Sequence, residues 1–321
     1  AERLLAPLMR DGELDDINKL LKAGAETVRA AAQEARGLLD PFRAFVEEDE
    51  RLRKSNSAHR SISAILTEQR RMDPSIARIV SDAFYDGGLT TSKSRATAAL
   101  EGSSPIEYVG PFPASPVVVV NFRHVSSPRR GEIPAVEHGR PAWHNPAEIE
   151  AVVDVLRHLR AKPGQRPTVA ILAPYRARVE QLRVRLDAAR KTCLSHLAEF
   201  ASVRSDGTLV GTVDSFQGNE ADVVVLSLVR NNARAGRRAL GFLQDRRRMN
   251  VALSRAKTQL VIVGSLDFLK EAVRGVNPDN EIHDLSFLTK MISVIDCLSQ
   301  EKHGDLPLAT LIDPAALRAG R

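Results

Sequence analysis

Short apolar runs alternate with helical segments of mixed polarity from residue 116 onward. The first run, Val117–Phe122, has no charged position, which is typical of a strand buried on both faces of a parallel sheet. Similar runs predict further strands at 168–173, 210–213, 222–229 and 259–264. Because helical segments separate most of these strands, the pattern predicts an α/β fold with a three-layer parallel sheet.

Helices are predicted between these strands. Asn145 is expected to cap a helix that reaches about Arg160, with Pro146 at its first position. Two more are expected at 175–190 and 247–256. Residues 59–110 are expected to start with a helix whose pattern ends at Gly87-Gly88, and the polar stretch 90–104 that follows is expected to be a surface loop.

The two ends of the chain read differently from this central part. Residues 1–58 predict a helical segment, with an alanine-rich stretch at 26–39 and an amphipathic piece from Pro41. We expect it to be an insertion in, or the edge of, a neighbouring domain, and it carries no recognisable chemistry. The tail, 276–321, predicts one amphipathic helix at 287–298. Three parts are therefore expected: 1–58, 59–275 and 276–321.

Composition narrows the class of protein. The net charge of +6 favours an anionic partner, but only weakly, because 46 basic residues stand beside 40 acidic ones. Two distant cysteines argue against a disulfide framework or a cysteine zinc site and favour a reducing, cytoplasmic setting. The 8 histidines lack ligand spacing, so no metal site is expected. No apolar run is long enough to span a membrane, so no membrane association is expected either.

Polar motifs follow the predicted strands. In TEQRRMDP, Gln69 precedes two arginines, Arg70 and Arg71, whose planar guanidinium groups suit phosphate oxygens; a solvated helix end is the alternative. In APYRARVEQLR, a strand runs directly into a helix that can present backbone N–H groups to an anion. The arginines at 176, 178, 183 and 185 could reach a nucleic-acid backbone or form an ordinary charged helix face.

The segment TVDSFQGNE combines small hydroxyl donors, Thr212 and Ser215, with Gly218, which allows a close backbone approach. Glu220 can accept a hydrogen bond from a sugar hydroxyl. Seven arginines and one acid lie between Arg230 and Arg248, and such crowding favours a bound anion over a structural role. The motif RMNVALSRAK then predicts a helix that carries Ser254 next to Arg255.

Together these motifs resemble superfamily 1 helicases of the branch that contains the up-frameshift RNA helicase and the Okazaki-fragment nuclease-helicase. LTEQRRMDP, APY, VDSFQGNE and GFLQDRRRMNVALSRAK stand in the family's order over roughly residues 60–275. The resemblance implies the second, C-terminal, RecA-like (P-loop NTPase) domain. It implies ATP and Mg²⁺ as cofactors, and single-stranded nucleic acid and a first RecA-like domain as partners.

The resemblance also implies roles for individual residues. Arg71 matches the arginine that contacts the γ-phosphate, and Arg255 matches the arginine finger. Residues assigned to nucleotide handling are Gln69, Arg70, Gln217, Gly218 and Glu220, with Glu220 near the ribose. Residues assigned to the nucleic-acid backbone are Pro174, Tyr175, Arg176, Thr212 and Ser215. The sequence departs from the family where Arg70 replaces tyrosine, Asp73 histidine, Ala173 threonine and Lys257 arginine.

The sequence lacks the phosphate-binding motifs of the first RecA-like domain. G-x-x-x-x-G-K-[ST] does not occur, and no Asp-Glu pair follows an apolar strand as a Mg²⁺ site. We therefore expect a fragment that hydrolyses ATP only as part of a longer helicase. A degenerate helicase half that serves as a non-catalytic docking module for nucleic acid or protein is the alternative.

Overall fold

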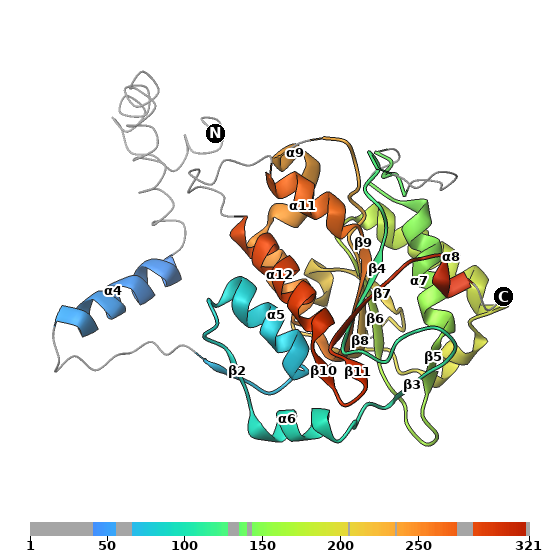
Figure 1. Ribbon diagram of the computed structural model, residues 1–321, viewed down its shortest axis with the longest axis horizontal. Coiled ribbons are helices and arrows are strands. Elements are labelled where there is room, and N and C mark those ends of the chain that lie inside the picture. Colours follow the sequence, from blue (N-terminus) through green and yellow to red (C-terminus); the bar gives the residue numbers. More distant parts are fainter. Residues whose placement is uncertain are drawn as a thin grey trace. The chain divides into compact units, whose positions relative to one another are not determined.

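A computed structural model describes residues 41–55, 66–127, 135–139, 143–204, 206–234, 236–274 and 285–318. The chain divides into two compact units, Ala1–Leu66 and Thr67–Arg321. In the first unit the described element is helix α4, Pro41–Ser55, which begins at the proline where an amphipathic piece was expected (Figure 1). The other expected helices of 1–58, and the start of 59–110, lie outside the described residues.

A six-stranded parallel sheet lies at the centre of the second unit (Figure 1). Its spatial order is β12-β4-β9-β8-β6-β7, and every neighbouring pair runs parallel. The strands are β4 Val117–Asn121, β6 Val169–Ala173, β7 Val210–Thr212, β8 Ala221–Ser227, β9 Ala256–Gly264 and β12 Ala309–Ile312. The predicted parallel sheet is confirmed, and its sixth strand comes from the tail.

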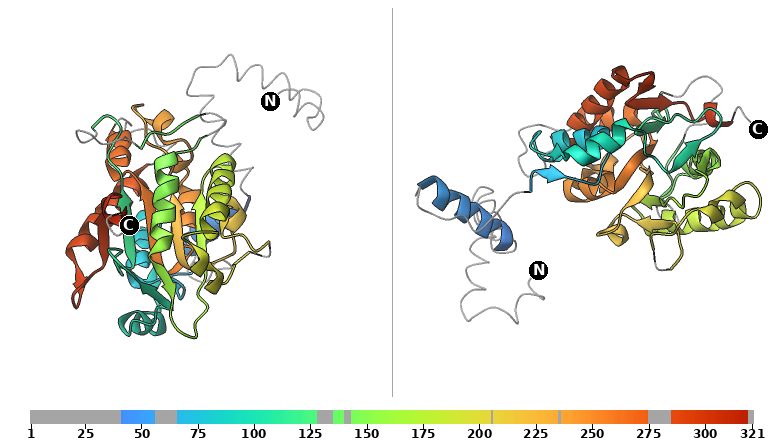
Figure 2. Two further views of the ribbon diagram at one scale, coloured as in Figure 1. Left: turned by 90° about the vertical axis from the view of Figure 1, so that its right-hand side faces the viewer. Right: turned by 90° about the horizontal axis from the view of Figure 1, so that it is seen from below.

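Helices cover both faces of this sheet (Figures 1 and 2). On one face lie α7 Pro146–Arg157 and α8 Arg176–Arg190, which bury Val152, Leu156 and Leu182 against alternate strand residues. On the other face lie α5 Pro74–Phe84, α9 Arg237–Leu240, α10 Arg246–Leu253, α11 Leu266–Arg274 and α12 Ser286–Gln300. The three-layer α/β architecture predicted from the apolar runs is confirmed.

Capping residues set where the helices begin. Asn145 accepts from the Glu148 N–H, with Pro146 at the first position of α7, as predicted; α7 ends at Arg157, three residues before the expected end. Asp73 caps α5 by accepting from the Ser75 N–H, and Asp245 caps α10 by accepting from the Arg248 N–H.

The predicted surface loop at 90–104 is wrong in part, because it contains helix α6, Lys93–Leu100, capped by Ser92. This helix buries no residue fully, so it has no apolar periodicity by which the sequence could reveal it. Short strand pairs complete the unit: β1 Glu68–Gln69 with β2 Thr90–Thr91, β3 Ile106–Tyr108 with β5 Leu159–Ala161, and β10 Lys302–His303 with β11 Leu306–Pro307.

The tail is part of the packed unit. Phe287 and Ile295 of α12 are fully buried in the same cluster as Ile76 and Ile79 of α5. Strand β12 pairs with β4, from Ala309 opposite Val117 to Ile312 opposite Val120. The expected boundary at residue 275 therefore falls inside the compact unit 67–321.

Candidate nucleotide and nucleic-acid site

Arg71, Glu220 and Arg255 meet at the amino edge of the sheet. Glu220 immediately precedes β8 and Arg255 immediately precedes β9, and the Ala221 N–H donates to the Arg255 carbonyl at 3.1 Å. Arg71 arrives from the turn between β1 and α5. These three residues are 149 and 35 positions apart in sequence order (71 to 220, then 220 to 255), and the parallel topology brings them together.

Hydrogen bonds fix both guanidinium groups, and Ser254 contacts the two of them. Arg71 donates through Nε to Glu220 Oε2 at 2.6 Å and through Nη1 to the Ser254 carbonyl at 3.1 Å. Arg255 donates through Nη2 to Ser254 Oγ at 3.1 Å and through Nε to the Val251 carbonyl at 3.0 Å. Both arginines are therefore held against the same serine, with fixed orientations.

The cluster carries one excess positive charge. Burial lowers the pKa of Arg255, the charge of Arg71 lowers it further, and Glu220 partly opposes both effects. The Arg71 and Glu220 side chains remain 33% and 46% exposed, so a ligand can reach them. Two close guanidinium groups beside a single carboxylate suit an added anion, because phosphate oxygens can accept from both.

Gln69 and Arg70 differ in what they contact. The Gln69 amide is fully engaged within the chain, since its Oε1 accepts from the N–H groups of Arg71 and Met72 and its Nε2 donates to Thr91 Oγ1 at 2.8 Å. Gln69 thus shapes the turn that carries Arg71. The Arg70 side chain is 80% exposed and pairs with Glu68.

Gln217 and Gly218 lie on the connection between β7 and β8. This connection starts at the carboxyl edge of the sheet, passes through the 3-10 helix η3 (Asp214–Phe216), and ends at Glu220 on the amino edge. Gly218 has a φ of +87°, which favours glycine there. Both residues are exposed. The predicted motif is therefore a bridge between the two edges of the sheet.

Tyr175 lies at the carboxyl edge, where β6 ends and α8 begins. Its hydroxyl accepts from the Phe242 N–H at 3.2 Å and from Arg230 Nη1 at 3.4 Å, and its ring meets the Phe242 ring edge-on at 6.3 Å. Pro174 precedes it and is partly buried, and Arg176 is the exposed first residue of α8. The structure thus places these three residues together, apart from the arginine pair.

Thr212 and Ser215 lie at the end of the neighbouring strand, β7. Thr212 Oγ1 accepts from the Ser215 N–H at 3.1 Å, and Ser215 Oγ donates to the Thr212 carbonyl at 2.9 Å. Arg204 donates to Ser215 Oγ at 3.1 Å and was not predicted. It comes from the polar loop before β7, and its only sequence signal is a basic residue among turn formers.

The arginines predicted along α8 do not form one charged face. Arg178 is fully buried, donates to Ser227 Oγ at 2.8 Å and lies 3.8 Å from Glu148. Arg183 reaches the Val210 carbonyl at 3.4 Å, and Arg185 pairs with Glu150 at 2.6 Å. Burial excludes Arg178 from a surface role, Arg183 and Arg185 have partners within the chain, and the exposed Arg176 stays a candidate.

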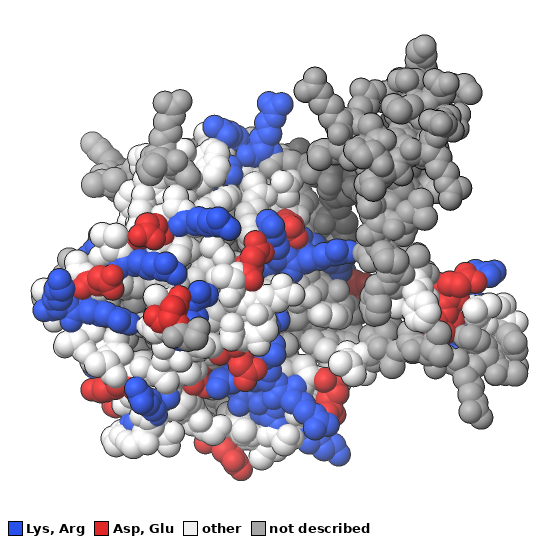
Figure 3. Space-filling model, turned by 180° about the vertical axis from the view of Figure 1, so that it is seen from behind, with Lys and Arg blue, Asp and Glu red and all other residues white. Residues whose placement is uncertain are grey.

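Several of the seven arginines of 230–248, from which a bound anion was inferred, have partners within the chain, and burial rules out a surface role for Arg230. Arg230 is buried, pairs with Glu137 at 2.8 Å and lies under the Trp143 ring at 4.3 Å. Arg246 donates to the Phe84 carbonyl at 2.9 Å, and Arg248 pairs with Asp214 at 3.2 Å. Acids distant in sequence neutralise part of the cluster, and on the face drawn in Figure 3 basic and acidic side chains lie interspersed.

Two departures from the family pattern have structural partners. Asp73 caps α5, and its N–H donates to the Lys257 carbonyl at 2.8 Å. Burial raises the pKa of Asp73, opposed by hydrogen bonds from Ser75. Lys257 pairs with Asp222 at 2.8 Å. Both therefore tie α5 to the amino edge of the sheet, beside Arg71.

The part of the chain that the structure describes holds no candidate metal site. Within those ranges, no three histidine, cysteine, aspartate or glutamate side chains come together in a way that could hold an ion. In the same ranges no helix is long and apolar enough to cross a membrane. The paired arginines remain the candidate chemistry of the amino edge.

The six-stranded parallel sheet with helices on both faces defines an α/β domain of RecA-like class. The profile of the family described as "AAA domain" matches residues 49–267. The chain belongs to this family, and its relatives are superfamily 1 helicases of the up-frameshift type.

Two curated relatives and one solved structure are similar to this chain. Putative helicase MOV-10 of Gallus gallus is 31% identical over 63% of this chain and 20% of that protein. Regulator of nonsense transcripts 1 of Dictyostelium discoideum is 32% identical over 64% of this chain and 14% of that protein. The C-terminal domain of a possible DNA helicase from a Lactobacillus matches 76% of this chain and 98% of that chain, at 17% identity and a TM-score of 0.34. The chain therefore spans a fifth or less of these two relatives' lengths.

Proposed function

We propose that this chain is the C-terminal motor domain of an ATP-dependent superfamily 1 helicase that acts on single-stranded DNA or RNA. The observation that carries the proposal is the cluster of Arg71, Glu220 and Arg255 at the amino edge, with its excess positive charge. An arginine that reaches a γ-phosphate from a second domain stabilises the charge that develops during phosphoryl transfer.

The residues fit the phosphate end of ATP. Arg71 and Arg255 would hold γ-phosphate oxygens, Glu220 would accept from the ribose, and the exposed Arg70 would stack on the adenine with its guanidinium plane. ATP supplies the phosphoanhydride bond whose cleavage drives the motor. Mg²⁺ would be held mainly by the first RecA-like domain, and this chain alone would be inactive.

The connection from β7 to β8 would couple the two edges. When phosphate oxygens take over the hydrogen bonds of Arg71, the Glu220 carboxylate is released from its 2.6 Å contact. Its movement passes through Gly218 and Gln217 to Ser215, because these residues share one short connection. Pro174, Tyr175, Arg176, Thr212 and Ser215 would contact the nucleic-acid backbone at the other end.

The setting proposed for this motor is the cytoplasm. Cys193 and Cys297 are both free, which suits a reducing compartment. A tagged full-length protein followed by fluorescence microscopy and fractionation checks this, and its accumulation in an oxidising compartment would contradict it.

The test uses the longer protein that includes the upstream domain. Arg71→Ala and Arg255→Ala should each lower nucleic-acid-stimulated ATP hydrolysis by about 10³-fold. Arg78→Ala on α5 is the control, because it removes only an exposed pair with Glu301. Wild-type turnover in Arg255→Ala would refute the mechanism. Oligonucleotide binding without any ATP hydrolysis, in a full-length protein that lacks a P-loop lysine, would favour the docking-module alternative.

A further inference from the structure

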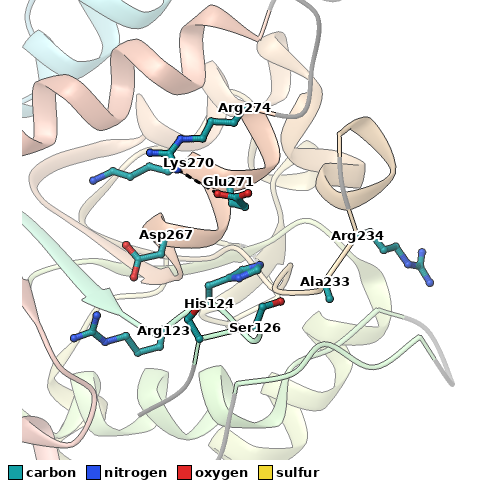
Figure 4. Close-up of a pocket in the computed structure, with 10 residues that line it drawn as sticks. Arg123, His124, Ser126, Ala233, Arg234, Asp267, Lys270, Glu271 and Arg274 are labelled. Atoms are coloured by element: carbon teal, nitrogen blue, oxygen red, sulfur yellow. Dashed lines mark hydrogen bonds and ion pairs between the residues drawn. The ribbon is translucent and has the colours of Figure 1, made fainter.

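A cavity of about 730 Å³ lies at the carboxyl edge of the sheet, between the ends of β4 and β9 (Figure 4). The two strands are neighbours, with Asn121 opposite Gly264. The chain leaves β4 toward α7 on one face and leaves β9 toward α11 on the other. Open α/β sheets bind ligands at such points, because opposite crossovers leave a crevice beyond the strand ends.

The rim of this cavity is basic. Its cations are Arg123 from the loop after β4, Arg234 from the loop after β8, and Lys270 and Arg274 from α11. Lys270 pairs with Asp296 at 3.2 Å and Arg274 with Glu271 at 3.3 Å. Figure 4 shows Arg123 and Arg234 on opposite sides of the cavity.

Within the described ranges, Arg123 and Arg234 are the cations of this rim whose charge is not balanced by a carboxylate. Both are exposed, and neither has a carboxylate within ion-pair distance among the described residues. Arg234 lies 5.5 Å from the Trp143 ring. Asp267 is the remaining acid at the cavity, so the two arginines leave a positive balance.

The loops that carry these arginines are fixed by buried side chains. Asn231, 1% exposed, donates to the Arg123 carbonyl at 2.9 Å and accepts from the Val125 N–H at 3.1 Å. The His124 ring contacts the Asn232 carbonyl at 3.1 Å and stacks on Phe268 at 6.0 Å. A rim held this firmly has a low ordering cost when it binds a ligand.

The cavity also continues the row of predicted nucleic-acid residues. In the strand order, Thr212 ends β7, Tyr175 follows β6, Arg234 follows β8, and Arg123 follows β4. All lie beyond carboxyl ends of parallel strands, along one edge of the sheet. A strand bound at β7 and β6 and continuing along this edge would reach the basic rim.

We propose that this cavity is a further phosphate site, in which Arg123 and Arg234 contact the backbone of the same single strand that Tyr175 and Ser215 contact. Ser126 and Ser127, exposed at the same rim, supply hydroxyl donors. The inference rests on the proposed nucleic-acid function and extends its site from β6 and β7 to β4 and β9.

The test measures binding of labelled single-stranded oligonucleotides of increasing length to the 321-residue chain over a salt series. Arg123→Gln with Arg234→Gln should weaken binding of the longer strands about tenfold and leave the shortest ligands unchanged. The slope of log K against log salt should become shallower by about one for each phosphate that the variant no longer binds. Arg190→Gln, at the far end of α8, removes one exposed charge and is the control.

Different outcomes separate the two proposals. Identical affinity and salt slope in the double variant, with binding still abolished in Arg176→Gln, would overturn the phosphate site and keep the proposed function. If the parent chain bound no oligonucleotide, both would fail. Inorganic pyrophosphate is the second probe. If the Arg123 substitution weakened pyrophosphate binding but left oligonucleotide binding unchanged, the cavity would be a site for a free phosphate compound, and the strand site would be overturned.

Discussion

Arginines differ in their roles in this molecule, and the burial and the partners of each guanidinium group determine the difference. Arg178 lies fully inside the domain beside Glu148 and Ser227. Arg71, in contrast, is a third exposed and pairs with Glu220 at the surface. A buried guanidinium must be paired to offset its desolvation, so it is structural. An accessible guanidinium group that is paired with one exposed carboxylate can exchange this carboxylate for a phosphate.

Glu220→Gln tests this exchange. Because the Arg71–Glu220 pair is substantially exposed, we expect a loss of less than about 1 kcal/mol in the free energy of unfolding, measured in urea. In the full-length protein the same change should reduce discrimination between ATP and its 2′-deoxy form, since it removes the carboxylate that we propose accepts from the ribose. Unaltered discrimination in steady-state kinetics would contradict the ribose role.

Gly241→Ala tests the support of Tyr175. Gly241 has a φ of +55°, and a Cβ there would collide with Arg230 Nη1 and the Tyr175 hydroxyl. We expect a destabilisation of about 1–3 kcal/mol and weaker oligonucleotide binding, because the tyrosine must move. Gly164→Ala, with a φ of +75° and open space around its Cβ, carries the backbone strain alone. Equal binding losses in both variants would show that Tyr175 is not involved.

At the scale of elements, β8 joins the two edges of the sheet. Glu220 precedes its first residue, and Val229, two residues after its last, has a φ of +71°, a strained value for a β-branched side chain. Two residues of the α7 cap hold Val229, since Glu148 Oε2 accepts from its N–H at 2.9 Å and Asn145 Nδ2 donates to its carbonyl at 3.3 Å. The start of α7 thus fixes where β8 ends and where Arg230 points.

Glu148 should make the stability of this junction depend on pH. Burial raises its pKa from 4.5 to about 7, against the opposing effects of Arg178, Ser227 and the Val229 N–H. Between these values the folded chain keeps a proton that the unfolded chain has released, so stability falls as pH rises from 4.5 to 7. The loss should be on the order of 2–3 kcal/mol.

Urea unfolding of the parent chain and of Glu148→Gln across this range provides the measurement. The difference between the two curves cancels the contributions of other titrating groups, including Asp222. Burial raises the pKa of Asp222, but hydrogen bonds from Lys257 and Thr168 lower it overall. We expect the parent to lose stability relative to the variant as pH rises. Parallel curves would show that Glu148 is ionised throughout.

At the scale of the whole molecule, the tail closes the sheet. β12 covers the edge of β4, and Leu317 from the 3-10 helix η6 (Ala316–Arg318) packs into the cluster beneath α7. An uncovered β4 would present unpaired backbone groups from an almost entirely apolar strand, which promotes aggregation. The tail therefore belongs to the stability of the domain that carries the site.

Two truncations separate these contributions. Removing 301–321 deletes β12 and should cause aggregation and a large loss of thermal stability. Light scattering measures the aggregation, and calorimetry measures the thermal stability. Removing 314–321 keeps β12 and should cost about 1–3 kcal/mol through the buried Leu317. Similar behaviour of the two variants would mean that β12 contributes little.

Most of the fold could be predicted from local patterns, because buried strands and capped helices leave signals a few residues long. The apolar runs around 117–122 and 222–229 and the Asn145-Pro146 cap predicted β4, β8 and α7 to within a few residues. Helix α6 and strand β12 were missed. The first buries no residue fully, and the second is a short strand with only Ala309 fully buried.

Sequence alone determined the fold class, the family and the candidate arginines, because these depend on residue types at short spacing. Only the tertiary structure decided which arginines are buried and paired and which are accessible, since the partners of Arg178 and Arg230 come from 30 and 93 positions away, at Glu148 and Glu137. The structure also placed Arg71 with Arg255 at one edge and Tyr175 at the other, because strand order follows crossovers and not sequence. Burial and pairing across the sheet, which no local pattern encodes, thus separate structural charges from available ones.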